Sequence, residues 1–289
     1  MSPDFAERST EVEIMDTVVT GFADFDECLR HIEIVNRLTL GYRPVLSWLK
    51  KILLPVSPKR PLTIIDVGSG RGEMLRQVWK LARREKIPVH LTGIDINPWS
   101  TAAAEKATPA DVGIHYETSN IFAMDTAQKA DFIISTYFTH HLGNDELVRF
   151  LRWMDDHSVQ GWFINDLHRH KAPYLFIKYV LPLVPINKMS RNDGPVSVAR
   201  AFTAADWRRA LQQAGIPPAQ SRIRWFFPFR YGVARWKSGQ AGVQAGSVRS
   251  FPTDGWRLVT RLLGLDFYDW QSSSSARIDS IGVATEFGI

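Results

Sequence analysis

The feature that most constrains the fold is a glycine-rich turn placed directly after a short apolar run. Residues 62–67 read Leu-Thr-Ile-Ile-Asp-Val, a composition typical of a buried strand. The following turn has glycine at positions 68, 70 and 72, and helical spacing of apolar residues resumes at Met74. A strand, a glycine turn and a helix in this order predict an α/β unit whose helix N-terminus presents unpaired N–H groups to a ligand.

The same alternation of strand and helix continues along the chain. Apolar patterning predicts further strands at residues 89–94, 114–117, 131–136 and 162–166, with helices at 74–81, 99–107 and 145–155. Residues 222–236 have the pattern of two more strands, which would finish the sheet in antiparallel fashion. Successive strands separated by helices require right-handed crossovers. We therefore predict an α/β fold with a doubly wound, mostly parallel, seven-stranded sheet.

Helical patterns also precede the first strand. Apolar residues at three- and four-residue spacing over residues 24–39 indicate an amphipathic helix, and Pro44 is well placed to begin a second one. We expect three parts: an N-terminal helical cover (1–60), a ligand-binding α/β domain (61–236) and a tail (237–289). The tail is rich in Gly, Ser and Gln, which favours poor order, and the sequence assigns it no role.

Composition excludes several classes of protein. The chain has 289 residues, of which 45% are hydrophobic, and a single cysteine, Cys28. These values exclude a wholly disordered chain and a disulfide framework, and they favour the cytoplasm. No apolar run reaches the roughly 18 residues that a membrane-spanning helix needs, and residues 1–10 do not form a secretory signal.

The net charge of +5 is unevenly distributed. Residues 168–236 carry 12 Lys/Arg against 2 Asp/Glu, a net of 12 − 2 = +10. Such a segment leaves a nucleic acid or an anionic membrane surface open as a partner. However, its arginines alternate with aromatic residues in expected strands, where aromatic side chains normally pack into the sheet. We therefore consider nucleic acid an unfavoured partner.

The glycine turn also restricts the ligand. A nicotinamide-binding turn would need a third glycine where this chain has Glu73, which would repel a pyrophosphate, and a phosphate-binding P-loop would need Gly-Lys-Ser/Thr. Glycines at 68, 70 and 72 with Asp66 two residues earlier suit a ligand that carries a cationic amino-acid end.

This turn resembles motif I of the class I S-adenosylmethionine-dependent methyltransferases, and Asp95 ends the second strand 29 residues after Asp66. The resemblance implies S-adenosylmethionine as the cofactor, with Asp95 on its ribose hydroxyls and Ile96 against its adenine. It also implies that Asn120 replaces the acid that usually bonds the adenine amino group. The cofactor-binding residues predicted in this way are Asp66, Gly68, Ser69, Gly70, Gly72, Asp95, Ile96, Asn120, Ile121, Ser135 and Thr136.

Several acceptor classes are disfavoured by the residues present. Amino-group methylases of adenine or glutamine usually carry Asn/Asp-Pro-Pro-aromatic where residues 135–138 read Ser-Thr-Tyr-Phe. Cytosine-C5 methylation needs a thiolate beyond motif I, whereas Cys28 precedes it. His140, His141, Asp145 and Asp166 could supply metal ligands, but adjacent histidine side chains normally point apart, so we expect no metal.

A longer resemblance indicates the substrate class. Residues 33–38, 41–43, 138–142, 165–169, 192–198 and 201–203 are similar to a bacterial group of small-molecule methyltransferases, often encoded beside type III polyketide synthases and flavin-dependent oxidoreductases. The resemblance covers about residues 14–236. It implies methyl transfer to oxygen, or to carbon, of a hydrophobic, aromatic, polyketide-like small molecule.

A phenol acceptor benefits from a general base, and histidine supplies a pKa near neutrality without tuning. The candidate bases follow the fourth and fifth strands, at the sheet edge where such folds bind ligands. We rank His141 first, His168 second and His140 third, and expect Asp166 to orient a neighbour. The apolar stretch 172–186 is expected to cap the acceptor pocket, and peripheral membrane contact through it is a further hypothesis.

Two rival functions remain open at this point. One is an RNA or tRNA methyltransferase that uses the basic segment 168–236. The other is a cofactor-binding protein that has lost catalysis and acts by interaction. The sequence assigns no oligomeric state.

Overall fold

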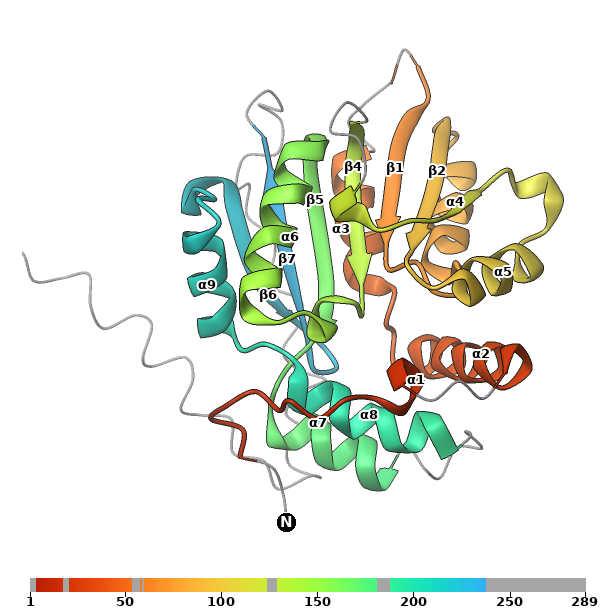
Figure 1. Cartoon of the computed structure of the whole chain (residues 1–289). Helices are drawn as coiled ribbons and strands as arrows, with labels where there is room; N and C mark the ends of the chain where they lie inside the picture. Colours follow the sequence, from red (N-terminus) through yellow and green to blue (C-terminus); the bar gives the residue numbers. More distant parts are fainter. Residues whose placement is uncertain are drawn as a thin grey trace, which may run out of the picture. The chain divides into compact units, whose positions relative to one another are not determined.

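A single seven-stranded sheet runs through the described part of the chain in the computed structural model, which comprises residues 4–17, 21–53, 58, 60–123, 129–180 and 188–237 (Figure 1). The strands are β1 (Leu62–Val67), β2 (Val89–Asp95), β3 (His115–Thr118), β4 (Ala130–Thr136), β5 (Ser158–Leu167), β6 (Ser221–Phe226) and β7 (Arg230–Trp236). Their order is β3-β2-β1-β4-β5-β7-β6. Neighbours among the first five pair in parallel, whereas β7 is antiparallel to both β5 and β6. The predicted fold class is confirmed.

The predicted helices are present, and four further ones, α1, α7, α8 and α9, accompany them. The helices are α1 (Ile14–Thr17), α2 (Phe22–Leu38), α3 (Arg43–Leu53), α4 (Glu73–Arg84), α5 (Pro98–Ala107), α6 (Asn144–His157), α7 (Lys171–Leu175), α8 (Lys188–Arg200) and α9 (Ala204–Gln213). Short turns of helix add η1 (Ala110–Val112), η2 (Ile121–Ala123), η3 (Thr139–His141), η4 (Phe176–Val180) and η6 (Pro218–Gln220). Sequence patterns missed α1 and α8, because α8 contains Asn-Asp-Gly-Pro, residues that usually mark a turn.

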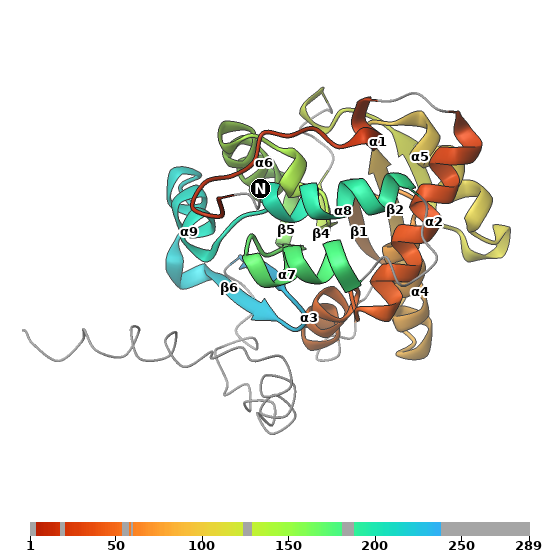
Figure 2. The ribbon, with the colours of Figure 1, turned by 90° about the horizontal axis from the view of Figure 1, so that it is seen from below.

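Four helices lie across one edge of the sheet. In Figures 1 and 2, α1, α2, α7 and α8 are grouped beyond the strand ends, and α8 contacts the other three. This is the edge at which the parallel strands β1, β2, β4 and β5 reach their carboxyl ends. Loops at these ends are where doubly wound sheets bind ligands, so the four helices cover the position expected for a site. The predicted domain limits stay a prediction; residues 238–289 lie outside the described part.

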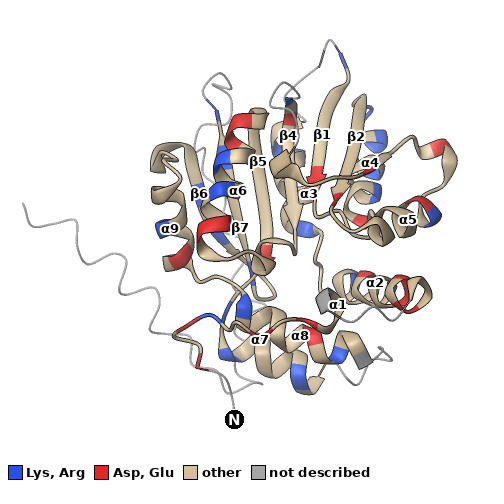
Figure 3. Ribbon diagram, in the orientation of Figure 1, with Lys and Arg blue, Asp and Glu red and all other residues tan. Residues whose placement is uncertain are grey.

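Three arginines of the basic segment are built into this fold, whereas Lys171, Lys178, Arg191, Arg208, Arg209 and Arg222 are exposed. Figure 3 shows Lys and Arg on several helices as well as on the strands. Arg169, Arg230 and Arg235 are buried. Arg169 donates to Asp206 at 2.6 Å, and Arg235 donates to Asp155 at 3.1 Å. These buried side chains form hydrogen bonds within the protein, so their charges are not available to a nucleic acid at the surface.

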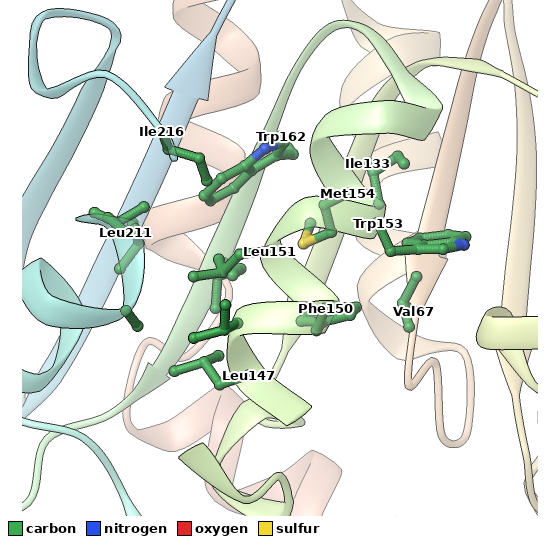
Figure 4. Packing of buried hydrophobic residues seen from close by; sticks show 14 of the residues in the cluster. Val67, Ile133, Leu147, Phe150, Leu151, Trp153, Met154, Trp162, Leu211 and Ile216 are labelled. Carbon is green, nitrogen blue, oxygen red and sulfur yellow. The ribbon is translucent and has the colours of Figure 1, made fainter. Parts of the chain in front are cut away.

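Two apolar cores form on the two faces of the sheet. One lies under α6 and α9 and contains Leu151, Met154 and Trp162, packed side by side (Figure 4). The other lies under α3 and α4 and contains Leu49 and Leu75. Burial of a side chain of this size contributes about 1.5–3 kcal/mol, so helices on both faces hold the sheet edge rigid beneath the site.

A buried carboxylate at the start of β4 ties the sheet together. Both Asp131 oxygens accept hydrogen bonds from Arg60, at 2.7 and 2.8 Å, and Oδ2 also accepts the Thr63 N–H at 2.9 Å. Burial opposes ionisation of Asp131, but the hydrogen bonds from Arg60 and Thr63 outweigh it and hold its pKa at about 2.

From the low pKa of Asp131 we predict that the protein loses stability at acidic pH. Because the folded pKa lies below the unfolded value, the stabilisation is present above about pH 4 and is lost as pH falls toward 2. Between pH 6 and pH 3, the free energy of unfolding should fall by about 1 kcal/mol more in the wild type than in Asp131→Asn. Urea denaturation of both proteins at the two pH values measures this difference, and equal losses would contradict the prediction.

Candidate active site

The glycine turn leaves β1 in a conformation that favours glycine. Gly68, Gly70 and Gly72 have φ angles of 71°, 50° and 73°, in the left-handed region that other residues rarely adopt. The N–H groups of Gly68 and Ser69 both donate to the carbonyl of Ile94, at 2.9 and 3.1 Å. The turn is thereby fastened to β2, and its backbone is positioned at the start of α4.

Space for a ligand lies against this turn. A methyl group at Gly70 would have just one neighbour within 4 Å among the described residues, a Leu29 carbon at 3.9 Å. The Gly70 N–H donates to Asp95 Oδ2 at 2.9 Å. The turn therefore presents an open backbone surface that a cofactor can approach closely.

Asp66 is a buried acid beside that surface. Its Oδ1 atom is buried and has no hydrogen-bond partner among the described residues. Burial, together with the charge of Asp95, raises the pKa of Asp66 well above its ordinary value. A cationic ammonium group would relieve both effects. This orphaned oxygen fits the amino-acid end of S-adenosylmethionine.

Asp95, at the end of β2, is already hydrogen-bonded on both oxygens. Oδ2 accepts from Gly70 and Oδ1 accepts the Asn97 N–H at 2.9 Å. The Ser100 side chain also hydrogen-bonds to this carboxylate. A carboxylate has about four acceptor positions, so it can still accept from a ribose hydroxyl. The next residue, Ile96, is 68% exposed, which leaves an apolar surface for an adenine ring.

The predicted cofactor residues after β3 and on β4 differ in whether their side chains are free to meet a ligand. The Asn120 side-chain oxygen accepts the Phe122 N–H at 3.0 Å, so it closes a local turn, and Ile121 is buried. Ser135 donates to the Val67 carbonyl at 2.9 Å and thus links β4 to β1. The Thr136 hydroxyl is buried without a hydrogen-bond partner in the described chain and is the better placed of the two β4 residues to meet a ligand.

A polar cluster stands directly after β4, on η3. Asp166 of β5 accepts the His140 backbone N–H at 3.0 Å and lies 2.8 Å from the His140 Nδ1 atom. Thr139 donates to the same carboxylate through a short hydrogen bond. Burial opposes ionisation of Asp166, but His140 and Thr139 outweigh it and hold the pKa of Asp166 below its ordinary value. These contacts orient the His140 ring, whose Nε2 atom lies 3.7 Å from Glu13 Oε1.

His141 lies on the same side of η3 as His140. The two rings have their centres 4.3 Å apart, and both line one pocket. The expectation that adjacent histidine side chains diverge is therefore not met, because the helical turn η3 rotates both toward α1 and α8. Burial raises the pKa of Asp95 despite the hydrogen bonds from Asn97 and Gly70.

His168, the remaining candidate base, lies apart from this pair. Its ring packs against His170 and Tyr231, with centres 5.3 and 4.7 Å away. Burial, followed by the charges of His170 and Arg169, lowers the pKa of His168 to about 4. A base with this pKa is a weak proton acceptor at neutral pH, and His168 is not among the described residues that line the pocket.

The pocket is mostly apolar and is enclosed by the helices at the sheet edge. Its apolar wall comes from α2, η4 and the turn before β7, with Cys28, Ile32, Val35, Phe176, Ile177 and Phe229. The predicted cap of residues 172–186 thus contributes to the pocket through its described part; residues 181–186 lie outside the described residues. Glu13, His140 and His141 form a polar cluster in this lining, which also contains Asp193 and Arg230.

Sequence patterns did not identify Glu13 or the residue that positions it. Asp193 of α8 accepts the N–H groups of Ile14 and Met15, at 2.9 and 3.0 Å, and so holds the start of α1 in place. Ser197 donates to Glu13 Oε1 at 2.9 Å. Asp193 belongs to a quoted stretch of the resemblance, but Glu13 lies in a short polar segment with no recognisable pattern.

Tyr137 and Arg230 are further pocket residues that sequence reasoning did not assign. The Arg230 guanidinium donates to the Tyr137 hydroxyl through a short hydrogen bond and to the Thr39 carbonyl at 2.9 Å. Burial raises the pKa of the Tyr137 phenol despite this arginine. The signal for Tyr137 was its place after the fourth strand, whereas nothing in the sequence pairs it with Arg230.

Comparison with known proteins decides the family. A family model described as "Methyltransferase domain" matches residues 41–217, more than half of the chain. The chain belongs to this methyltransferase family. The predicted class is confirmed: it is a class I S-adenosylmethionine-dependent methyltransferase, and S-adenosylmethionine is its cofactor. Asp66, the glycine turn and Asp95 are the residues that would hold it.

Solved structures show the same fold at low sequence identity. The plantazolicin methyltransferase BpumL in complex with SAH has a TM-score of 0.52 and 15% identity, over 75% of this chain and 97% of that one. Human N-acetylserotonin methyltransferase in complex with SAM has a TM-score of 0.56 and 12% identity, over 81% of this chain and 61% of that one. These likenesses concern the fold.

A curated relative covers a smaller part. Release factor glutamine methyltransferase of Enterococcus faecalis is 33% identical over 106 residues, which is 36% of this chain and 37% of that protein. The match thus spans little more than a third of the relative's length. Within the described residues, no helix of this methyltransferase is both long and apolar enough to cross a membrane.

Proposed function

We propose that this methyltransferase transfers a methyl group to oxygen, or to carbon, of a hydrophobic, aromatic, polyketide-like small molecule. One observation carries the proposal: a mostly apolar pocket contains a polar cluster, and its lining residue Tyr137 directly follows Thr136, one of the predicted cofactor residues. Its apolar wall suits an aromatic or alkyl-bearing body. Its polar cluster suits a hydroxyl group that has to lose a proton.

The chain's residues have two tasks in this reaction. Bound S-adenosylmethionine supplies a methyl group on a positively charged sulfur. The enzyme aligns the acceptor with that methyl group, which α2, η4 and α8 do by enclosing it. It also favours removal of the acceptor proton, for which we propose His140, held by Asp166, together with His141. This order differs from the one predicted, because Asp166 reaches His140 and because His168 is outside the pocket lining.

Structural neighbours that act on small molecules support the substrate class. BpumL has been crystallised with desmethylplantazolicin analogues, and human N-acetylserotonin methyltransferase is named for a small aromatic substrate. Buried Arg169, Arg230 and Arg235 argue against a nucleic acid, because their charges are directed into the protein. We propose the cytoplasm as the location. Peripheral membrane contact stays a prediction, with exposed Tyr179 and Val180 as its described support.

Transfer of labelled methyl groups tests the proposal. The enzyme is incubated with tritiated S-adenosylmethionine and, separately, with products of type III polyketide synthases, simple phenols and bulk tRNA. Label is expected in the aromatic compounds and not in tRNA. Label in tRNA would favour the nucleic-acid function, and cofactor binding without transfer to any acceptor would favour a catalytically silent binding protein.

A further inference from the structure

The polar cluster of the acceptor pocket brings together three groups that bind divalent metal ions. Glu13, His140 and His141 each offer a ligand atom, and these atoms all lie within 4.8 Å of one another. Two imidazoles and one carboxylate form the protein ligand set of many catalytic zinc sites, in which further positions stay open. All three residues line the pocket. We propose that Glu13, His140 and His141 bind a divalent transition-metal ion such as Zn²⁺.

The spacing of the ligand atoms supports this proposal. His140 Nε2 lies 3.7 Å from Glu13 Oε1, which is too long for a hydrogen bond. Two ligands of a tetrahedral ion with bonds of about 2.1 Å lie about 3.4 Å apart. A small closing movement of either side chain would therefore bring both atoms onto one ion.

The surroundings of the three residues are those of an oriented metal site. Metal-binding histidines commonly donate the other ring N–H to a carboxylate, which fixes the ring and raises its basicity. Asp166 does this for His140 at 2.8 Å. Glu13 is likewise held, by the Ser197 hydroxyl at 2.9 Å. Both supporting groups are buried, so the ligands are oriented by the fold itself.

The open positions of such an ion would face the acceptor. The acceptor class is then an aryl hydroxyl that coordinates through its oxygen, and the metal lowers the pKa of that hydroxyl. The O–H bond breaks and the proton leaves to water; the bond from oxygen to methyl carbon forms as the methyl–sulfur bond breaks, leaving a neutral thioether. This catalytic part rests on the proposed methyl transfer, in which the metal ion would take over from His140 and His141 the task of favouring proton loss, whereas metal binding itself does not rest on it.

Metal binding is tested on the full-length chain without an acceptor. After dialysis against a chelator, Zn²⁺ is titrated by calorimetry and Co²⁺ by its visible absorption. We expect one ion per chain, and a loss of affinity of at least about tenfold in Glu13→Gln and in His141→Ala, since even residues that merely support ligands are worth 10–100-fold. His115→Ala, an exposed histidine on β3, is the matched control. Absence of binding, or equal binding by the variants, would overturn the site.

The catalytic part is tested by methyl transfer to a phenol before and after chelation. Transfer should fall at least about tenfold in the chelated enzyme and return with Zn²⁺, while calorimetric affinity for S-adenosylmethionine stays unchanged. Transfer that is unaffected by chelation would overturn the catalytic metal and favour metal-free His140 as the base, yet leave the proposed function standing. Metal binding with no transfer to any acceptor would refute the proposed function and leave the metal site standing.

Discussion

Replacing Asp95 by alanine is expected to weaken S-adenosylmethionine binding about a hundredfold, or about 3 kcal/mol. The carboxylate can accept from the ribose beyond the hydrogen bonds it already accepts from Gly70, Asn97 and Ser100. Its loss removes those contacts and also releases the Gly70 N–H, which loosens the glycine turn. Calorimetric titration of the purified variant measures the effect.

Two further variants separate these contributions. Asp95→Asn keeps one acceptor oxygen, so its affinity should lie between those of wild type and Asp95→Ala. Asp111→Ala removes an exposed acid on η1 and should bind as the wild type does. Unchanged affinity in Asp95→Ala would exclude Asp95 as the ribose ligand.

Substitution of His140 should reduce turnover by about 10²–10⁴-fold while sparing cofactor affinity. His140→Asn is the sharper variant, because its amide N–H can still donate to Asp166 in place of Nδ1 while the Nε2 position is lost. The prediction follows from the 2.8 Å contact with Asp166 and from the position of His140 in the pocket lining. Single-turnover methyl transfer, with S-adenosylmethionine affinity measured in parallel, checks it.

His168→Ala provides the comparison for this prediction. His168 has a pKa of about 4 and packs on Tyr231, so its loss should leave the rate of the chemical step near that of the wild type. If His168→Ala slows transfer more than His140→Asn does, the order of the candidate bases is wrong and the one predicted from the sequence is closer to the truth.

The cofactor half of the site could be predicted because its signals are local. Gly68, Gly70 and Gly72 share one turn, and Asp95 ends a strand whose apolar pattern is plain. Parallel strands carry such groups to the same edge of the sheet. Ser135 is the exception, since its place on β4 gave no sign that its hydroxyl would be used to bridge to β1.

The acceptor half could be predicted only in outline. The histidines after β4 and the apolar stretch after β5 indicated where the pocket lies. The ranking of the candidate bases depends on which imidazole hydrogen-bonds to Asp166, and that depends on the conformation of η3. Glu13 lies more than 90 residues from His140 in the sequence, and so does Arg230 from Tyr137. Periodicity in a sequence does not predict contacts between residues so far apart.

A crystal structure of the enzyme with S-adenosylhomocysteine would test the central claim most directly, namely that the glycine turn holds the cofactor and the adjoining apolar chamber holds the acceptor. The ligand is predicted to place its amino group at Asp66, its ribose on Asp95 and its sulfur toward the pocket lined by His140 and His141. Binding elsewhere, or a sulfur walled off from that pocket, would contradict the account.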